Sequence, residues 1–178
     1  LLLYQGRAVG CIYNRKPNVE PYPMETALQM SILDSFQPAS TLIIYDLPAE
    51  VITSMSAMFL GVPVSLGENK EALKILRNSL KAMKKTGETG CFTLSLPNEG
   101  DLALVLFYRG DLFGVFHVDG QAFSGSLQSA EKLIKKSESA TLELSILPKE
   151  MMSDAVLFGY GLSTTITELE EGPARAKI

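Results

Sequence analysis

The sequence contains little of what catalytic and metal-binding sites are made of. Its 178 residues include one histidine, His117, and two cysteines, Cys11 and Cys91. A serine or cysteine nucleophile needs a base within hydrogen-bond reach, and a protein metal site needs several closely spaced ligands. No HxxxH or CxxC spacing occurs in the chain. We therefore expect no catalytic residue, no metal site, no cofactor and no enzymatic activity.

The two cysteines are too far apart in the sequence to form a metal site or a disulfide framework. Each is followed by an apolar residue, Ile12 or Phe92, in a segment that we expect to be a strand. Their pattern is typical of small buried residues in a reducing compartment, which predicts a cytoplasmic location. The alternative is a cross-strand disulfide, which would need oxidising conditions and a suitable geometry.

The chain also lacks an excess of positive charge and any long apolar run. Its net charge is −4 and its pI is about 5.1, whereas a general nucleic-acid surface needs a basic stripe to displace counterions. No apolar stretch approaches the roughly 20 residues of a membrane span. We therefore expect neither nucleic acid nor membrane as a partner. Leu1–Tyr4 is apolar but has no basic region or cleavage site of a signal peptide. Because there is no initiating methionine, we expect the natural protein to continue upstream.

What the sequence does contain is an apolar hairpin motif that occurs twice. Residues 105–116 read Val-Leu-Phe-Tyr-Arg-Gly-Asp-Leu-Phe-Gly-Val-Phe, and residues 1–12 read Leu-Leu-Leu-Tyr-Gln-Gly-Arg-Ala-Val-Gly-Cys-Ile. The tyrosine and both glycines of the first segment recur 104 positions later. In each copy two apolar strands flank a tight x-Gly-x turn, where glycine takes a positive φ without steric cost. The motif predicts two copies of one module.

A second match follows each hairpin. Residues 41–50, Thr-Leu-Ile-Ile-Tyr-Asp-Leu-Pro-Ala-Glu, align with residues 141–150, Thr-Leu-Glu-Leu-Ser-Ile-Leu-Pro-Lys-Glu, and Gly61 aligns with Gly161. The separation here is 100, so the first copy carries four extra residues, which we place in the proline-rich stretch 14–23. Repeats of this length are independent modules rather than units of a solenoid.

Hydrophobic periodicity and turn residues predict the elements of both copies. In the first copy, residues 1–65, we expect the hairpin 1–13, a helix 24–35, a strand 40–46 and a helix that begins at Pro48. In the second copy, residues 66–162, we expect a helix over 70–85, a strand over 90–96 and a two-stranded hairpin over 101–118. A helix over 126–137, a strand over 140–146 and a closing helix over 149–158 would follow. Residues 163–178 are predicted to be a polar tail or linker.

These elements predict an α+β fold. The full module is α-β-β-β-α-β-α with a mainly antiparallel sheet, present in tandem, and the first copy is truncated at its N-terminus. The hairpin strands are apolar at almost every position, which predicts burial on both faces. Helices would cover one face, and the other copy would cover the second.

Three groups of residues were weighed as functional candidates. Thr86–Gly90 resembles a phosphate-binding loop, but it precedes a strand and lacks the Gly-Lys-Ser/Thr ending, so a helix cap and turn explain it. The methionine pairs Met55/Met58 and Met151/Met152 are typical of a core, or of a plastic protein-binding surface. The possible interaction surface predicted from the sequence comprises Tyr4, Tyr108, Phe113, Phe116, Met55 and Met58.

Residues 79–116 resemble a known family. Lys85-Thr86-Gly87, the strand Gly90–Leu94 and the hairpin Leu106–Gly114 look like the bacterial DUF4388 or PatA-amino-terminal-like domains, in which a Lys-Thr-Gly-x-Leu strand precedes a Phe-x-x-Gly-x-Ile/Val hairpin. The resemblance covers about one copy of the module. It implies a cytoplasmic, non-catalytic role in signalling or scaffolding and offers no catalytic residues.

The sequence therefore leads to two hypotheses about function. The first is a non-enzymatic regulatory or scaffolding module in bacterial signalling, which binds a protein partner or associates with itself. The alternative is a small-molecule-binding sensor domain, with a pocket between the two repeats lined by Tyr4, Tyr108, Phe113 and Phe116. An enzyme would require a cleft that joins His117 to buried carboxylates.

Overall fold

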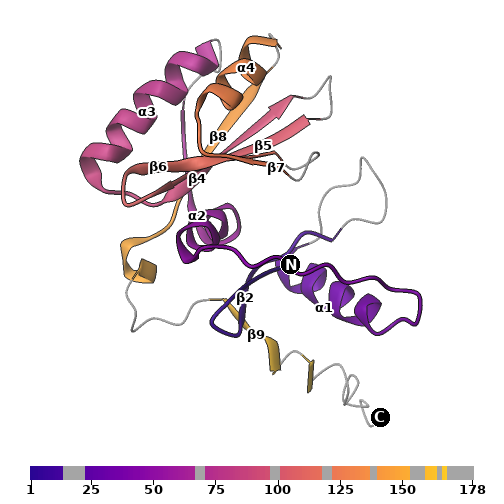
Figure 1. The fold of residues 1–178 in the computed structure, drawn as a ribbon. Coiled ribbons are helices and arrows are strands. Elements are labelled where there is room, and N and C mark those ends of the chain that lie inside the picture. The colour runs from indigo at the N-terminus through magenta and orange to yellow at the C-terminus, as the bar shows by residue number, and fades with distance from the viewer. Residues whose placement is uncertain are drawn as a thin grey trace, which may run out of the picture.

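The computed structural model describes residues 1–13, 23–66, 71–96, 101–117, 122–136, 140–152, 159–163 and 166–167. The fold is α+β, as predicted, with a six-stranded and a three-stranded sheet, both antiparallel (Figure 1). The strands are β1 (Leu2–Tyr4), β2 (Arg7–Gly10), β3 (Val62–Val64), β4 (Gly90–Leu96), β5 (Asp101–Tyr108), β6 (Asp111–His117), β7 (Ala122–Ser124), β8 (Thr141–Ile146) and β9 (Tyr160–Gly161). The helices are α1 (Met24–Ser35), α2 (Ala49–Leu60), α3 (Ala72–Thr86), α4 (Gln128–Lys136) and the 3-10 helix η2 (Lys149–Met152).

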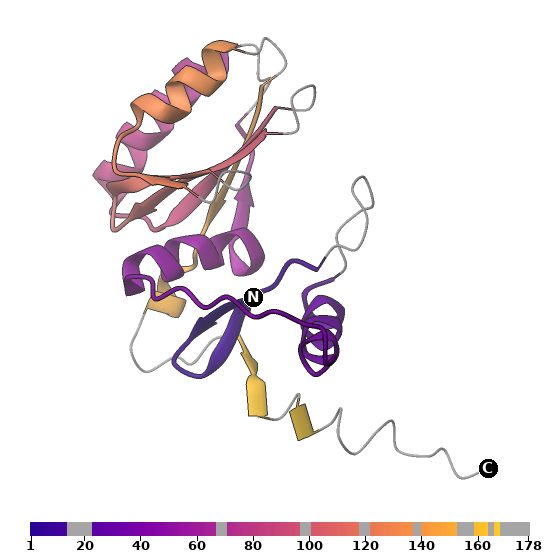
Figure 2. The same cartoon turned by 45° about the vertical axis from the view of Figure 1, so that its right-hand side comes forward.

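The large sheet is built around the predicted meander of β4, β5 and β6, in the order β3-β8-β4-β5-β6-β7. Its strands bury both faces, because side chains alternate along a strand. Phe92, Leu94 and Val105 belong to one buried cluster, to which α3 and α4 contribute Leu76 and Ile134. In both views α3 and α4 lie side by side on this face (Figures 1 and 2).

The opposite face of the large sheet is covered by α2, which precedes this sheet's central strands in the chain and lies in the predicted first repeat. Cys91, Leu104 and Leu106 form a second cluster with Val51 and Ala57 of α2. Figures 1 and 2 show α2 between the large sheet and the β1–β2 hairpin. Both faces of the large sheet are therefore buried by helices, which confirms the expectation of burial on both faces.

The two predicted hairpins have the same shape. In the first, Leu2, Leu3 and Tyr4 lie opposite Gly10, Ala8 and Arg7. In the second, Leu106, Phe107 and Tyr108 lie opposite Gly114, Leu112 and Asp111, which is the same register 104 residues later, with the irregularity at the same position. Both turn residues have positive φ in each copy: Gln5 and Gly6, and Arg109 and Gly110. Such a turn matches the twist of the flanking strands.

Each half of the chain contributes one strand to the sheet of the other half. Strand β3, which follows α2, pairs with β8 of the large sheet. Strand β9, near the end of the chain, pairs with β2. Leu162 and Ile166 also pack against the cluster that α1 forms with β2. Ile166, which lies in the predicted polar tail, therefore contacts the cluster of α1 and β2, and the domain boundaries at 65 and 162 stay predictions.

Two predicted elements differ in the structure. Residues 40–48 form no strand, although 41–46 match the β8 sequence pattern, because no neighbouring strand pairs with them in the described part of the chain. The closing helix predicted over 149–158 is a 3-10 helix over Lys149–Met152, and residues 153–158 lie outside the described residues. The tandem arrangement as a whole stays a prediction.

Candidate functional site

The six residues predicted as an interaction surface lie in two places. Met55 and Met58 of α2 and Phe113 and Phe116 of β6 are half-buried and pack against the cluster between α2 and the large sheet. These four side chains are therefore partly covered by the core cluster, and their role as an interaction surface stays a prediction. Tyr4 and Tyr108 are also half-buried and occupy equivalent places at the ends of β1 and β5.

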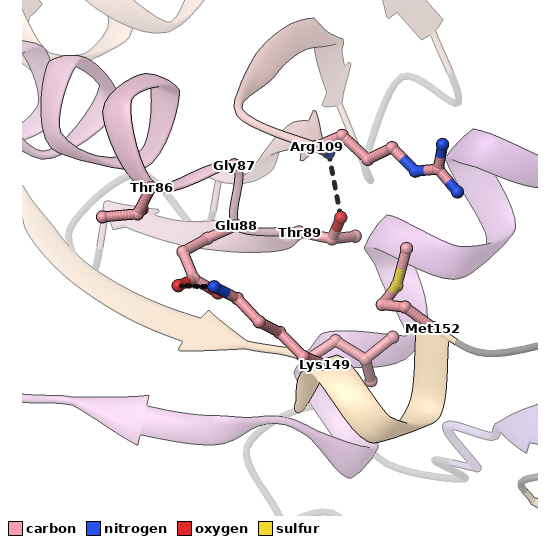
Figure 3. A pocket seen from close by; sticks show the side chains of 8 residues that line it. Thr86, Gly87, Glu88, Thr89, Arg109, Lys149 and Met152 are labelled. Carbon is pink, nitrogen blue, oxygen red and sulfur yellow. Dashed lines mark hydrogen bonds and ion pairs between the residues drawn. The ribbon is translucent and has the colours of Figure 1, made fainter.

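A small pocket forms where three turns meet (Figure 3). Its volume is about 250 Å³, and it is lined by Thr86, Gly87, Glu88, Thr89, Arg109, Leu147, Lys149 and Met152. The pocket contains most of the loop that resembled a phosphate site. Gly87, with a φ of 68°, ends α3 as a left-handed cap whose N–H donates to the Met83 carbonyl. The predicted role of this glycine as a helix cap is confirmed.

The polar groups around this pocket are engaged in holding the three turns together. The Arg109 N–H donates to the Thr89 hydroxyl over 2.9 Å, and the Gly110 N–H donates to the Glu88 carbonyl over 2.6 Å. The Leu147 N–H donates to the Thr89 carbonyl over 2.8 Å. These bonds join the start of β4 to the β5–β6 turn and to the end of β8, so they explain the loop as a structural junction.

The charged side chains at this pocket include one ion pair and one guanidinium. The Lys149 ammonium lies 3.4 Å from the Glu88 carboxylate, and the Lys149 side chain is largely exposed. The Arg109 guanidinium lies 5.3 Å from the centre of the Tyr108 ring, a cation–π contact. Figure 3 shows the Arg109 side chain running away from the Glu88–Lys149 pair. The pocket therefore does not concentrate two cations on one ligand position.

The described residues hold no assembled reactive centre. His117 lies at the end of β6, opposite Ala103 and Ala122. Cys11 and Cys91 are both free and buried, in different clusters. Burial raises the pKa of the Cys91 thiol to about 12, so this thiol stays neutral and is a poor nucleophile. Within the described ranges no group of three or more histidine, cysteine or carboxylate residues could hold a metal ion.

The most unusual surface of the described structure is the stretch that sequence patterns predicted to be a strand. Residues 41–47 run in extended, irregular form between α1 and α2 (Figure 2). Leu42, Ile43, Ile44 and Tyr45 expose 75%, 67%, 82% and 63% of their surface. We call residues 42–45 the exposed segment. Monomeric soluble proteins rarely expose contiguous apolar patches without a function.

The apolar pattern of residues 41–46 does not distinguish this surface from a buried strand. Residues 41–46 match residues 141–146 at the apolar positions Leu42 and Ile44. Strand β8, over 141–146, pairs with β4 and β3, whereas residues 41–46 form no such pairing with any described residue. No signal in the sequence therefore indicates that these residues are exposed.

Comparisons of the chain with protein-family models, with curated proteins and with solved structures found no match. The resemblance to the DUF4388 and PatA-amino-terminal-like domains therefore stays a prediction. No helix in the described part of the chain is long and apolar enough to cross a bilayer.

Proposed function

We propose that this chain is a non-enzymatic interaction module that binds a protein partner through the exposed segment. The observation that carries the proposal is the exposure of four consecutive apolar residues, 42–45, each more than 60% exposed. Burying an apolar side chain of this size contributes on the order of 1.5–3 kcal/mol before the costs of association are subtracted. A partner that covers this segment would gain several such contributions.

The physical character of the segment favours a protein partner. Its side chains are aliphatic and aromatic, and three of the four residues are Ile or Tyr, which favour extended backbone. An exposed apolar stretch with strong β propensity promotes aggregation unless another chain covers it. The resemblance noted above implies a regulatory or scaffolding role in the bacterial cytoplasm, and such a role agrees with a surface built for binding.

The alternative, a small-molecule sensor with a pocket between the repeats, has less support. The pocket near Arg109, of about 250 Å³, is lined by residues of the second repeat and includes none of Tyr4, Tyr108, Phe113 and Phe116, so it is not the predicted pocket. Its volume lies below the roughly 300–1,000 Å³ of most ligand sites. We favour protein binding because the exposure of residues 42–45 is a specific observation in its favour.

Site-specific photo-crosslinking tests the proposal. A benzophenone amino acid at position 43 should form adducts with a protein in an extract of the source cells. The matched control carries the same group at position 143, which is exposed at the equivalent place of the second repeat. We expect adducts from position 43 and few from position 143. Equal labelling at both positions, or none at position 43, would contradict the proposal.

A further inference from the structure

Three apolar positions of the first repeat are exposed although their counterparts in the second repeat are almost completely buried. Leu3, Leu42 and Ile44 expose 42%, 75% and 82% of their surface. Their counterparts Phe107, Leu142 and Leu144 expose 0%, 2% and 2%. The hairpin pair is equivalent by register and the other two pairs by sequence alignment. The described residues around the first repeat therefore do not cover these positions as the second repeat covers its own.

One strand contacts all three counterparts. Strand β4 lies between β5 and β8 in the large sheet. Its Gly90 lies opposite Phe107 of β5, and its Phe92 and Leu94 lie opposite Leu144 and Leu142 of β8. Strand β4 is thus the element that completes the second repeat between its hairpin and its last strand.

The first repeat has both flanking pieces of this arrangement. Strand β1, the counterpart of β5, is an edge strand of the three-stranded sheet. Residues 41–46, the counterpart of β8, are extended but form no ladder with any described residue. In both views this extended stretch passes close to the start of the chain, where β1 begins (Figures 1 and 2).

We propose that β1 and residues 41–46 together form a docking site for one antiparallel β-strand of a protein partner. This strand would take the place that β4 has in the second repeat, and the proposal rests on the proposed function. Its chemistry follows from β4: large apolar side chains at the positions of Phe92 and Leu94, and small residues at the positions of Gly90 and Cys91. Main-chain hydrogen bonds would provide affinity, and alternate side chains would provide specificity.

A strand fits this place better than a helix or a second copy of the chain. An edge strand such as β1 pairs through its main chain with another extended chain, which a helix cannot provide. The strand β4 of a second copy is already paired on both edges inside its own sheet. Pairing of two exposed segments with each other would leave the edge of β1 uncovered, and so would leave Leu3 exposed.

A peptide with the β4 sequence is the probe for this site. Residues 89–96 are synthesised with Cys91→Ser and two terminal lysines for solubility, and binding to the full chain is measured by fluorescence anisotropy. We expect binding at least tenfold tighter than that of a scrambled peptide. A Leu94→Pro peptide should also bind at least tenfold more weakly, because proline removes a ladder hydrogen bond. The chain variant Ile44→Lys should weaken binding of the β4 peptide at least tenfold, with an unchanged circular dichroism spectrum.

Disulfide trapping then tests the register. A peptide with cysteine at the position of Phe92 should crosslink rapidly to the Ile44→Cys chain, because the equivalent residues are opposite each other in the second repeat. The same peptide should crosslink at least tenfold more slowly to the Ile43→Cys chain, because successive side chains point to opposite faces.

The possible outcomes separate this inference from the proposed function. If the β4 peptide does not bind while position 43 still captures a partner, the strand is wrong and the interaction module stands. If the chain instead forms dimers that Ile44→Lys disrupts and the peptide does not compete, a second copy occupies the site and the inference is overturned. Tight, register-specific binding of the peptide supports it.

Discussion

Helix α2 carries two fully buried serines, and replacing each in turn isolates one contact between α2 and the large sheet. The Ser54 hydroxyl lies 2.7 Å from the Glu50 carbonyl of its own helix and 3.0 Å from the Phe107 carbonyl of β5. The bond described for Ser56 stays within the helix, 2.7 Å to the Thr53 carbonyl. Both serines are 0% exposed, so Ser56→Ala is a matched control for Ser54→Ala.

The expected magnitudes differ because only Ser54 reaches a second element. Ser54→Ala removes a donor from a buried carbonyl, which costs about 1–3 kcal/mol, while the higher helix propensity of alanine returns about 0.5 kcal/mol. We therefore expect a net loss of roughly 0.5–2.5 kcal/mol in the free energy of unfolding. Ser56→Ala loses an intrahelical bond and gains the same propensity, so its effect should stay within about 0.5 kcal/mol.

Urea denaturation followed by circular dichroism measures both variants. A loss of 2 kcal/mol with an m-value of about 2 kcal/mol/M lowers the midpoint by about 1 M. Unchanged m-values would show that the denatured states are comparable. If the two variants lose the same stability, the Ser54–Phe107 bond does not hold α2 to the large sheet, and the reasoning about this contact is refuted.

Three further predictions follow from single positions. Gly6 and Gly110 both have positive φ, but their surroundings differ. A Cβ added at Gly110 would meet the backbone of the last turn of α3, whereas a Cβ added at Gly6 would have no neighbouring atom within 4 Å. In thermal denaturation Gly6→Ala should cost about 1 kcal/mol, and Gly110→Ala should cost clearly more; equal losses would contradict the packing of the turn. An added Cβ at Gly10 would overlap a ring of α2, so Gly10→Ala should cost about 1–3 kcal/mol. Gly125→Ala, which enters open space, should change stability by less than about 0.5 kcal/mol, and a reversed order would show that α2 does not lie over β2. Burial raises the pKa of the Cys91 thiol to about 12, so the folded state holds this proton more tightly than the unfolded state does. Its contribution to stability should be complete below pH 9 and fall as the pH rises toward 12, and a Cys91→Ala variant that keeps the full pH dependence would refute this assignment.

Elements with a local cause could be predicted from the sequence. Both hairpins form where predicted, because a glycine at the turn permits positive φ and apolar residues flank it. Helix α3 ends at Gly87 for a similar reason. The Ser126 hydroxyl accepts a hydrogen bond from the Gln128 N–H at the start of α4, as a capping serine does. In each case the decisive interaction lies within a few residues.

Elements that depend on a distant neighbour could not be predicted in the same way. Residues 41–46 and 141–146 have similar patterns, yet only the second segment is a strand, because β4 and β3 pair with it. The sequence did not decide whether Met55 and Met58 of α2 belong to the core or to a protein-binding surface. The structure shows that both methionines are partly buried against the cluster between α2 and the large sheet.

By itself the amino-acid sequence determined the α+β class, the two hairpins, most of the helices and the scarcity of reactive side chains, because short-range periodicity and turn chemistry are written in neighbouring residues. Only the tertiary structure decided that α2 lies between two sheets, that β3 pairs with β8 and β9 with β2, and that residues 42–45 are exposed. Those features depend on pairing and burial between residues far apart in the chain, and a strand without a partner cannot be recognised from its own sequence.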